Sequence, residues 1–352
     1  MNEVKAASAD LKPFLAKIAG GASLTESEAQ DAFAVIRGGT ATPAQAAAYL
    51  MALRVRGETV AEIAGAARIM QAKALRVRAP EGAIDTCGTG GDGAGTLNIS
   101  TAVALVVAAC GVPVAKHGNR AASSKSGTAD VLSALGVNIE ASVDVVEDCL
   151  RQANIGFLFA PRHHSATRHV AAVRQELGVR TIFNLLGPLS NPPGATRQLM
   201  GVYSAQWVEP LANVLGHLGS ERAWVVHGSD RLDEITVTGP SKVAALERKG
   251  DGFKVTTFEV TPEEAGLKRS KPEELKGGDP AHNAAAMKTL LHGRGGAYRD
   301  IVVLNAAAAL LVADKVGNLK DGAEMALEAV MSGRAAKSLA ALVAVSNGKA
   351  AP

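Results

Sequence analysis

The chain has 352 residues, a formal net charge of +3, and a composition that is 47% hydrophobic, 20% charged and 3% aromatic. A chain of this length and hydrophobicity can bury a large core, which excludes general disorder. The small basic excess is spread without runs of like charge, so composition gives no reason to expect a nucleic-acid partner. Many Ala, Val, Leu and Gly residues favour helices packed on a buried parallel sheet, and we expect an α/β fold.

Residues 1–80 are predicted to form a helical domain. Residues 11–18 place their apolar side chains on one face of a helix. Three capping boxes then mark helix starts: Thr25 with Glu28, Thr42 with Gln45, and Thr59 with Glu62. Residues 1–5 lack a secretory signal, and the longest apolar run, residues 101–110, is far shorter than the roughly 20 residues that cross a bilayer. We therefore expect a cytoplasmic protein with no membrane partner.

From residue 82 onward, short apolar runs end in Gly, Asn or Ser and are followed by helical stretches, which is typical of a parallel sheet. Strands are predicted at residues 83–87, 112–116, 155–160, 222–227, 234–238 and 254–260. Helices are predicted at residues 281–291, 301–313 and 324–331. Cys87, Cys110 and Cys149 form no CxxC pair, which argues against a disulfide framework or a zinc site.

A glycine-rich segment, residues 88–96, follows the first predicted strand and leads into an apolar helix. Glycines let backbone amides approach oxygen atoms closely, and a helix start adds the positive end of its dipole, so this segment predicts a phosphate site. A mobile turn is the alternative. No Lys-Ser or Lys-Thr pair closes the loop, so a P-loop is excluded.

A second polar segment, residues 116–130, follows the second predicted strand and contains Lys116, Arg120 and Lys125 beside several hydroxyl groups. Open parallel sheets bind ligands at the carboxyl ends of their strands. We therefore predict that both segments bind one multiply charged phosphate ester, with a solvated polar turn as the alternative.

Two further features are more ambiguous. Asp233 and Glu234 are adjacent carboxylates that could hold Mg²⁺ on a pyrophosphate substrate, although such a pair is often merely exposed. Arg174 could pair with Glu176 or face solvent.

Together these motifs resemble the anthranilate phosphoribosyltransferase family from about residue 11 to residue 344. The resemblance rests on residues 88–92, 98–101, 116–120, 123–127, 174–188 and 233–234. It implies transfer of phosphoribose from 5-phosphoribosyl 1-pyrophosphate to anthranilate in tryptophan biosynthesis. It also implies a helical domain of residues 1–80 joined by helices at about 171–189, and an α/β domain of residues 81–170 and 190–352 with a mainly parallel sheet. A homodimer through the helical domain is expected.

The resemblance also implies roles for individual residues. Phosphoribosyl pyrophosphate would contact Gly88, Gly91, Asp92, Thr96, Asn98, Ile99, Ser100, Thr101, Lys116, His117, Gly118, Asn119, Arg120, Ala121, Ala122, Ser123, Ser124 and Thr128. Anthranilate would contact Gly88, Asn119 and Arg174. Ser100, Asp233 and Glu234 would hold Mg²⁺, with two ions expected.

No covalent intermediate is expected, and Lys116 would stabilise charge in the transition state. Thr128 stands where the family commonly has Ser, so a hydroxyl is retained. The alternatives are a pyrimidine nucleoside phosphorylase and a nucleic-acid-binding relative of the same fold. Residues 98–101 and the adjacent carboxylates argue against the first. The mild basic excess suggests the second, but the basic residues lie among the substrate loops and the acidic pair is intact, which argues against it.

Overall fold

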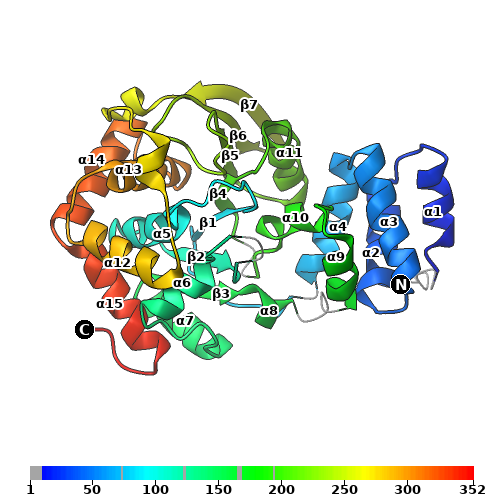
Figure 1. Ribbon diagram of the computed structural model, residues 1–352, viewed down its shortest axis with the longest axis horizontal. Coiled ribbons are helices and arrows are strands. Elements are labelled where there is room, and N and C mark those ends of the chain that lie inside the picture. The colour runs from blue at the N-terminus through cyan, green and yellow to red at the C-terminus, as the bar shows by residue number, and fades with distance from the viewer. Residues whose placement is uncertain (1–9, 73, 122–123, 165–168, 193–194) are drawn as a thin grey trace. The chain divides into compact units, whose positions relative to one another are not determined.

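The computed structural model describes residues 10–72, 74–121, 124–164, 169–192 and 195–352, which form two compact units (Figure 1). The smaller, helical unit contains the described residues of Met1–Leu75 and Pro161–Ser190, and the larger, α/β unit contains those of Arg76–Ala160 and Asn191–Pro352. The described residues of 161–170, which were expected in the α/β domain, fall in the helical unit by this division.

The helical unit begins with four helices whose starts follow from the sequence. They are α1 (Lys12–Ala19), α2 (Glu26–Arg37), α3 (Pro43–Arg56) and α4 (Val60–Ala72). Capping boxes begin α2 and α3, and Thr59 and Glu62 exchange the same pair of hydrogen bonds before α4. The three predicted capping boxes are therefore confirmed. The second segment of the unit adds α8 (Ala160–His163), α9 (Ala171–Leu177), α10 (Phe183–Leu186) and the 3-10 turn η2 (Pro188–Ser190).

The α/β unit is built on a seven-stranded sheet in the order β3-β2-β1-β4-β5-β6-β7. Its strands are β1 (Ile84–Gly88), β2 (Val114–Gly118), β3 (Ile155–Phe159), β4 (Arg197–Gly201), β5 (Arg222–Gly228), β6 (Ser241–Lys249) and β7 (Gly252–Val260). The first five are parallel, and β6 and β7 are antiparallel to their neighbours. The expected fold class, a mainly parallel sheet with a small helical domain, is confirmed.

Some strand predictions were wrong. Residues 234–238 form a loop and not a strand, and β4 and β6 were not predicted. The chain adds β2 and β3 on one side of β1 and then returns to add β4 on the other side. The order in which strands are added to the sheet therefore reverses between β1 and β4. Ligands of open α/β sheets bind at such a reversal, beyond the carboxyl ends of the strands.

Within the part of the chain that the structure describes, eleven helical segments accompany this sheet. They are α5 (Ile99–Ala109), α6 (Thr128–Ala134), α7 (Val143–Gln152), η3 (Ala205–Trp207), α11 (Val208–Leu218), η4 (Pro262–Ala265), η5 (Pro272–Leu275), α12 (Pro280–Leu291), α13 (Ala297–Val312), α14 (Leu319–Met331) and α15 (Arg334–Ser346). Within this unit, Figure 1 shows α5 grouped with α12 to α15, and α11 beside β5 and β6. Buried residues of α5 and α13 form the centre of the main core, which fixes the start of α5 against the ends of β1 and β2.

Among the described helices, none is by itself long and apolar enough to cross a membrane. The bent pair α14 and α15 is long and apolar enough to do so only when its two helices are taken together, by length and composition alone.

Candidate active site

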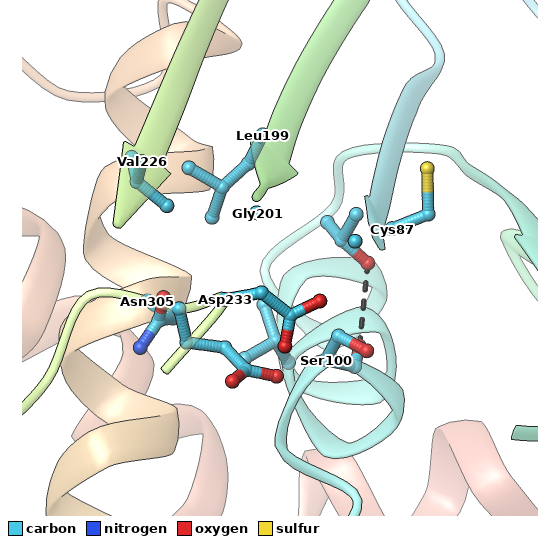
Figure 2. A pocket seen from close by; sticks show the side chains of 11 residues that line it. Cys87, Ser100, Leu199, Gly201, Val226, Asp233 and Asn305 are labelled. Carbon is cyan, nitrogen blue, oxygen red and sulfur yellow. Dashed lines mark hydrogen bonds between the residues drawn. The ribbon is translucent and has the colours of Figure 1, made fainter. Parts of the chain in front are cut away.

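A pocket opens at the carboxyl ends of β1, β4 and β5, where the sheet reverses direction (Figure 2). It is lined by Thr86, Cys87, Gly88, Ser100, Val103, Leu199, Gly201, Val226, Asp233, Glu234 and Asn305. The predicted metal ligands Ser100, Asp233 and Glu234 therefore share one pocket, although Ser100 is far from the other two in the chain.

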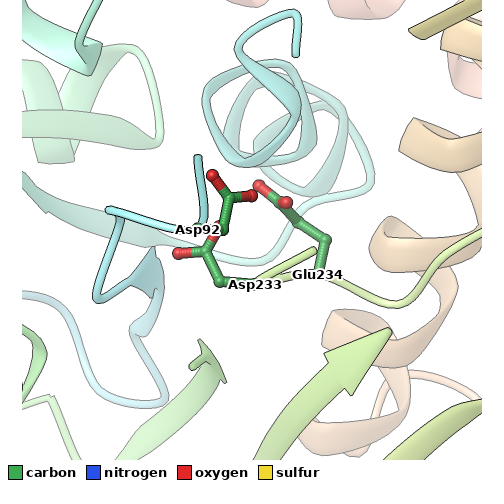
Figure 3. Close-up of side chains that lie close together, drawn as sticks. All are labelled: Asp92, Asp233 and Glu234. Atoms are coloured by element: carbon green, nitrogen blue, oxygen red, sulfur yellow. The ribbon is translucent and has the colours of Figure 1, made fainter. Parts of the chain in front are cut away.

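Asp92 joins Asp233 and Glu234 in a carboxylate trio (Figure 3). One oxygen from each of the three side chains lies within 4.8 Å of the others. Burial, followed by repulsion from Asp92, raises the pKa of Asp233 to about 6. Burial, followed by the charges of Asp233 and Asp92, raises the pKa of Glu234 well above its ordinary value.

The trio fits a divalent cation. Glu234 Oε2 is buried and has no hydrogen-bond partner among the described residues. Carboxylate oxygens are the ligands that Mg²⁺ prefers, and an ion here would offset the repulsion that raises both pKa values. Asp92 was expected to contact the phosphoribosyl donor and not the metal. The Gly-Asp pair in a strand-end loop could have suggested a ligand, but its approach to a carboxylate pair in a distant segment could not be predicted.

Two glycines make room for Asp233. A Cβ atom on Gly88 would lie 2.3 Å from Asp233 Oδ2, and one on Gly201 would lie 1.5 Å from the Asp233 carbonyl oxygen. Real Cβ atoms do not approach other atoms so closely. Gly90 N–H donates to Asp233 Oδ2 at 2.7 Å. The ends of β1 and β4 therefore carry glycine because the loop of residues 230–238, called the acidic loop below, passes directly against them.

Two residues that were not predicted from the sequence, Asn305 and Asp230, hold this acidic loop. The Asn305 side chain accepts from Ile235 N–H at 3.0 Å and donates to the Ile235 carbonyl at 2.7 Å, which fixes the residue after Glu234. Asp230 Oδ2 accepts from the hydroxyls of Thr236 and Thr238 at 2.6 and 2.7 Å. Asn305 is a lone polar residue in an otherwise apolar helical stretch, which is a signal that could have been used.

Lys116 lies beneath the pocket. It is 2% exposed, and its Nζ donates to the Thr86 carbonyl at 2.5 Å and to Ser100 Oγ at 3.3 Å. Burial lowers the pKa of Lys116, and the carboxylate of Asp85 opposes that change. The ammonium group thus contacts protein oxygens and holds Ser100, the second residue of α5.

The glycine-rich loop has the backbone geometry of a phosphate site. Gly90 and Gly91 adopt φ angles of 62° and 73°, which favour glycine. The loop leads to the amide end of α5, where Ile99 is buried and Ser100 is partly exposed. Thr96, near the end of the loop, forms an isolated antiparallel bridge with Lys276.

Three residues that were predicted to bind the phosphoribosyl donor, Asn98, Thr101 and Thr128, form hydrogen bonds within the protein. The Asn98 side chain bonds the Ser126 carbonyl, the Ser126 hydroxyl and the Asn283 amide. Thr101 and Thr128 bond each other through their hydroxyls at 3.4 Å. Asn98 therefore ties the two predicted phosphate loops together, and Thr128 can make its bond as well as a serine would.

The second loop is folded around one aspartate. Asp130 accepts from the amides of Ala121 and Gly127 at 2.9 and 3.0 Å, and it pairs with the Arg120 guanidinium at 3.0 Å. Asn119 Oδ1 accepts from Arg120 N–H at 2.7 Å. The loop begins after His117 and Gly118, at the end of β2, and includes Ser124; Ala122 and Ser123 lie outside the described residues.

Arg174 lies on α9 of the helical unit. Its guanidinium stacks over the Phe183 ring, with its carbon 5.0 Å from the ring centroid. Among the described residues it has no hydrogen-bond or ion-pair partner, so the pairing with Glu176 that sequence allowed is not formed. Burial lowers its pKa from the ordinary value, but a guanidinium remains charged near neutral pH.

Comparisons with known proteins agree with this geometry. The chain matches a glycosyl transferase family helical bundle domain over residues 12–74 and a glycosyl transferase family α/β domain over residues 80–336. It is 62% identical to anthranilate phosphoribosyltransferase of Paramagnetospirillum magneticum over 337 residues, which cover 96% of each chain.

Two solved structures have the same fold. The anthranilate phosphoribosyltransferase of Thermus thermophilus is 46% identical, with a TM-score of 0.88, over 95% of this chain and 99% of that one. The Saccharomyces cerevisiae enzyme in complex with phosphoribosyl pyrophosphate and Mg is 27% identical, with a TM-score of 0.87, over 96% and 98% of the two chains. The chain therefore belongs to the anthranilate phosphoribosyltransferase family.

Proposed function

We propose that this chain uses its carboxylate trio and its two strand-end loops to carry out the reaction of its family. The phosphoribosyl group passes from 5-phosphoribosyl 1-pyrophosphate to the amino group of anthranilate, which gives N-(5-phosphoribosyl)anthranilate and pyrophosphate for tryptophan biosynthesis. The observation that carries the proposal is the trio of Asp92, Asp233 and Glu234 beside a glycine-rich loop that opens a helix. This combination suits a substrate that carries pyrophosphate and a divalent cation.

The donor binds through the amides of residues 88–96, the first turn of α5 and the loop that begins at Asn119. Backbone amides and a helix N-terminus stabilise phosphate oxygens without needing many side-chain charges. Lys116 adds a fixed positive charge below Ser100, within the unit that holds the pyrophosphate. That charge stabilises the negative charge that develops on the leaving group.

Asp92, Asp233 and Glu234, together with the Ser100 hydroxyl, would hold Mg²⁺. When bound, Mg²⁺ neutralises pyrophosphate oxygens and so assists their departure. A bound cation would keep all three carboxylates ionised, and their charge together with that of pyrophosphate exceeds what one divalent ion balances, which supports the binding of two ions. Manganese substitution and counting of bound ions by paramagnetic resonance tests this number; one ion per chain at saturation would contradict it.

Anthranilate contacts Gly88, Asn119 and Arg174 by the family resemblance. The Arg174 guanidinium is stacked on an aromatic ring and has no carboxylate partner among the described residues, which supports its use as the partner of a substrate carboxylate. The aromatic amine of anthranilate is neutral near pH 7, so it needs correct placement and no general base. No side chain forms a covalent bond to the ribose.

The reaction can be followed by the loss of anthranilate fluorescence. Loss that requires both the donor and Mg²⁺ is the expected result. Folded protein that leaves anthranilate unchanged, but cleaves uridine or thymidine with inorganic phosphate, would replace the proposal with a nucleoside phosphorylase. DNA binding that weakens with salt, in the absence of either activity, would indicate a nucleic-acid-binding protein.

Homodimerisation through the helical unit is a further part of the proposal. The family resemblance carries this part, and Val55 on α3, which is 81% exposed, is a side chain that such an interface would bury. Light scattering should give about twice the 36.0 kDa mass of one chain. A mass of one chain at micromolar concentration would contradict it.

A further inference from the structure

The strands β1 and β2 are paired differently from their neighbours. β1 pairs with β4 along its whole length, from Ile84↔Arg197 to Gly88↔Gly201, and β2 pairs with β3 from Val114↔Ile155 to Gly118↔Phe159. β1 and β2 form a backbone pair at Ile84↔Val114, near their amino ends. Toward the carboxyl ends, where the two candidate phosphate loops begin, side chains bridge the two strands instead.

Asp85 of β1 makes the first bridge. Its side chain is fully buried, and Oδ1 accepts from the His117 N–H of β2 at 3.2 Å. In a regular parallel ladder this amide would donate to a backbone carbonyl of β1. The carboxylate thus takes the place of a ladder hydrogen bond.

Lys116 makes the reciprocal bridge from β2 to the Thr86 carbonyl of β1. The register puts Thr86 level with Lys116, so successive side chains place Lys116 and Asp85 on opposite faces of the sheet. Two oppositely charged, buried side chains therefore hold the same pair of strand ends from the two faces.

Asn191 completes the arrangement. It is the first residue of the α/β unit after the helical segment that ends at Ser190. Its Nδ2 donates to Asp85 Oδ2 at 2.6 Å and to the Ala115 carbonyl at 2.9 Å. One amide therefore contacts the bridging carboxylate of β1 and the backbone of β2.

The chemistry at Asp85 requires a carboxylate. Oδ1 accepts from a backbone amide, and Oδ2 accepts from Asn191 Nδ2 and from the Cys87 thiol at 3.1 Å. Both oxygens of Asp85 accept hydrogen bonds. An asparagine of the same shape would have to point its NH₂ group at one of these donors, and that hydrogen bond would be lost. Burial raises the pKa of Asp85, and the positive charge of Lys116 opposes that change.

We propose that Asp85 and Asn191 are positioning residues that fix the separation of the carboxyl ends of β1 and β2. They thereby set the distance between the loop of residues 88–96 and the loop that begins at Asn119. The inference rests on the proposed function, because the phosphoribosyl donor is the ligand that would bind both loops. Asp85 and Asn191 thus act on donor binding although neither lines the pocket.

Asp85→Asn tests this assignment in steady-state kinetics with both substrates. The Michaelis constant for the donor should rise about tenfold, the effect of losing one charge-assisted buried hydrogen bond, while that for anthranilate changes less than about twofold. Titration calorimetry of the donor with Mg²⁺ should show the same loss of affinity. Asn191→Ala removes the amide that donates to both Asp85 Oδ2 and the Ala115 carbonyl, and it should raise the donor constant and spare the anthranilate constant in the same way.

Ser346→Ala is the matched control, because Ser346 is buried on α15 and its hydroxyl accepts from Asn138 N–H at 3.1 Å, far along the chain from the loops. It should lower the melting temperature without changing either constant. Equal changes of both constants in Asp85→Asn, or an unchanged donor constant in Asn191→Ala, would overturn the proposal. If Asp85→Asn does not fold, Asn191→Ser is measured in its place. An inactive wild type would contradict the proposed function instead.

Discussion

At the scale of single residues, the chemistry of the site depends on groups whose partners lie far away in the sequence. Sequence motifs identified Ser100, Asp233 and Glu234, and these residues line one pocket. Asp92 was assigned a different partner, because only folding brings it to Asp233 and Glu234. Residue types could thus be predicted within each motif, whereas contacts between motifs could not.

Arg174 gives a test of substrate assignment. Arg174→Ala should raise the Michaelis constant for anthranilate by at least about tenfold, because a guanidinium–carboxylate pair is worth more than about 1.4 kcal/mol. The constant for the donor should stay within about twofold. Arg54→Ala on α3, which removes an exposed guanidinium, is the control. A larger change in the donor constant would assign Arg174 to phosphate binding.

At the scale of elements, helices with capping boxes and strands rich in β-branched residues were predicted well. β6 was missed because its Ala, Leu, Glu and Lys residues favour a helix, and its strand conformation comes from pairing with β5 and β7. Residues 234–238 have strong strand propensity, but Thr236 and Thr238 bond Asp230 and turn this segment into the acidic loop. Tertiary contacts overrode local propensity in both cases.

The packing of this loop against β4 leads to a prediction about stability. Gly201→Ala should destabilise the protein by about 2 kcal/mol or more, because the new methyl group would overlap the Asp233 carbonyl. It should also weaken Mg²⁺ dependence by displacing Asp233. Gly317→Ala adds a methyl group where no atom lies within 4 Å, and its effect should stay within about 0.5 kcal/mol. Equal denaturation midpoints for the two variants would show that the close approach is absent in solution.

At the scale of the whole molecule, the stability of the helical unit is expected to depend on pH through two buried histidines. His164 is 4% exposed within the helical unit. Burial, followed by the charges of Arg37 and His163, lowers the pKa of His164 to about 4. Burial also lowers the pKa of His163. Both imidazoles are therefore expected to be neutral in the folded protein at pH 7.

This shift predicts the direction of the pH dependence. The unfolded imidazole has a pKa near 6.5, so the stabilising contribution is complete above that pH and is lost as pH falls toward about 4. The loss at His164 can reach about 3 kcal/mol at pH 4. Urea unfolding at about pH 7 and about pH 4.5 should show a smaller pH effect in His164→Gln than in the wild type or in His292→Gln, an exposed control. An unchanged pH effect in His164→Gln would contradict the burial of a neutral imidazole.

The fold class, the family and the reaction could be predicted from sequence because the motifs at the ends of β1 and β2 are local and dense. The positions of Asp230, Asn305, Asp85 and Asn191 could not, since each acts through contacts that the chain makes only when folded. These residues share one property: they are polar groups that satisfy backbone, hydroxyl or carboxylate partners next to the site.

The most direct test of the account is the magnesium dependence of turnover in Asp233→Asn combined with Glu234→Gln. Removing two of the three carboxylates should lower kcat by at least about 10²-fold and abolish saturation with Mg²⁺, as expected when charge stabilisation in the transition state is lost. Asp251→Asn, in the exposed turn between β6 and β7, should behave as wild type. A double variant with the turnover and the magnesium saturation of the wild type would contradict the assignment of the metal site and of the active site built around it.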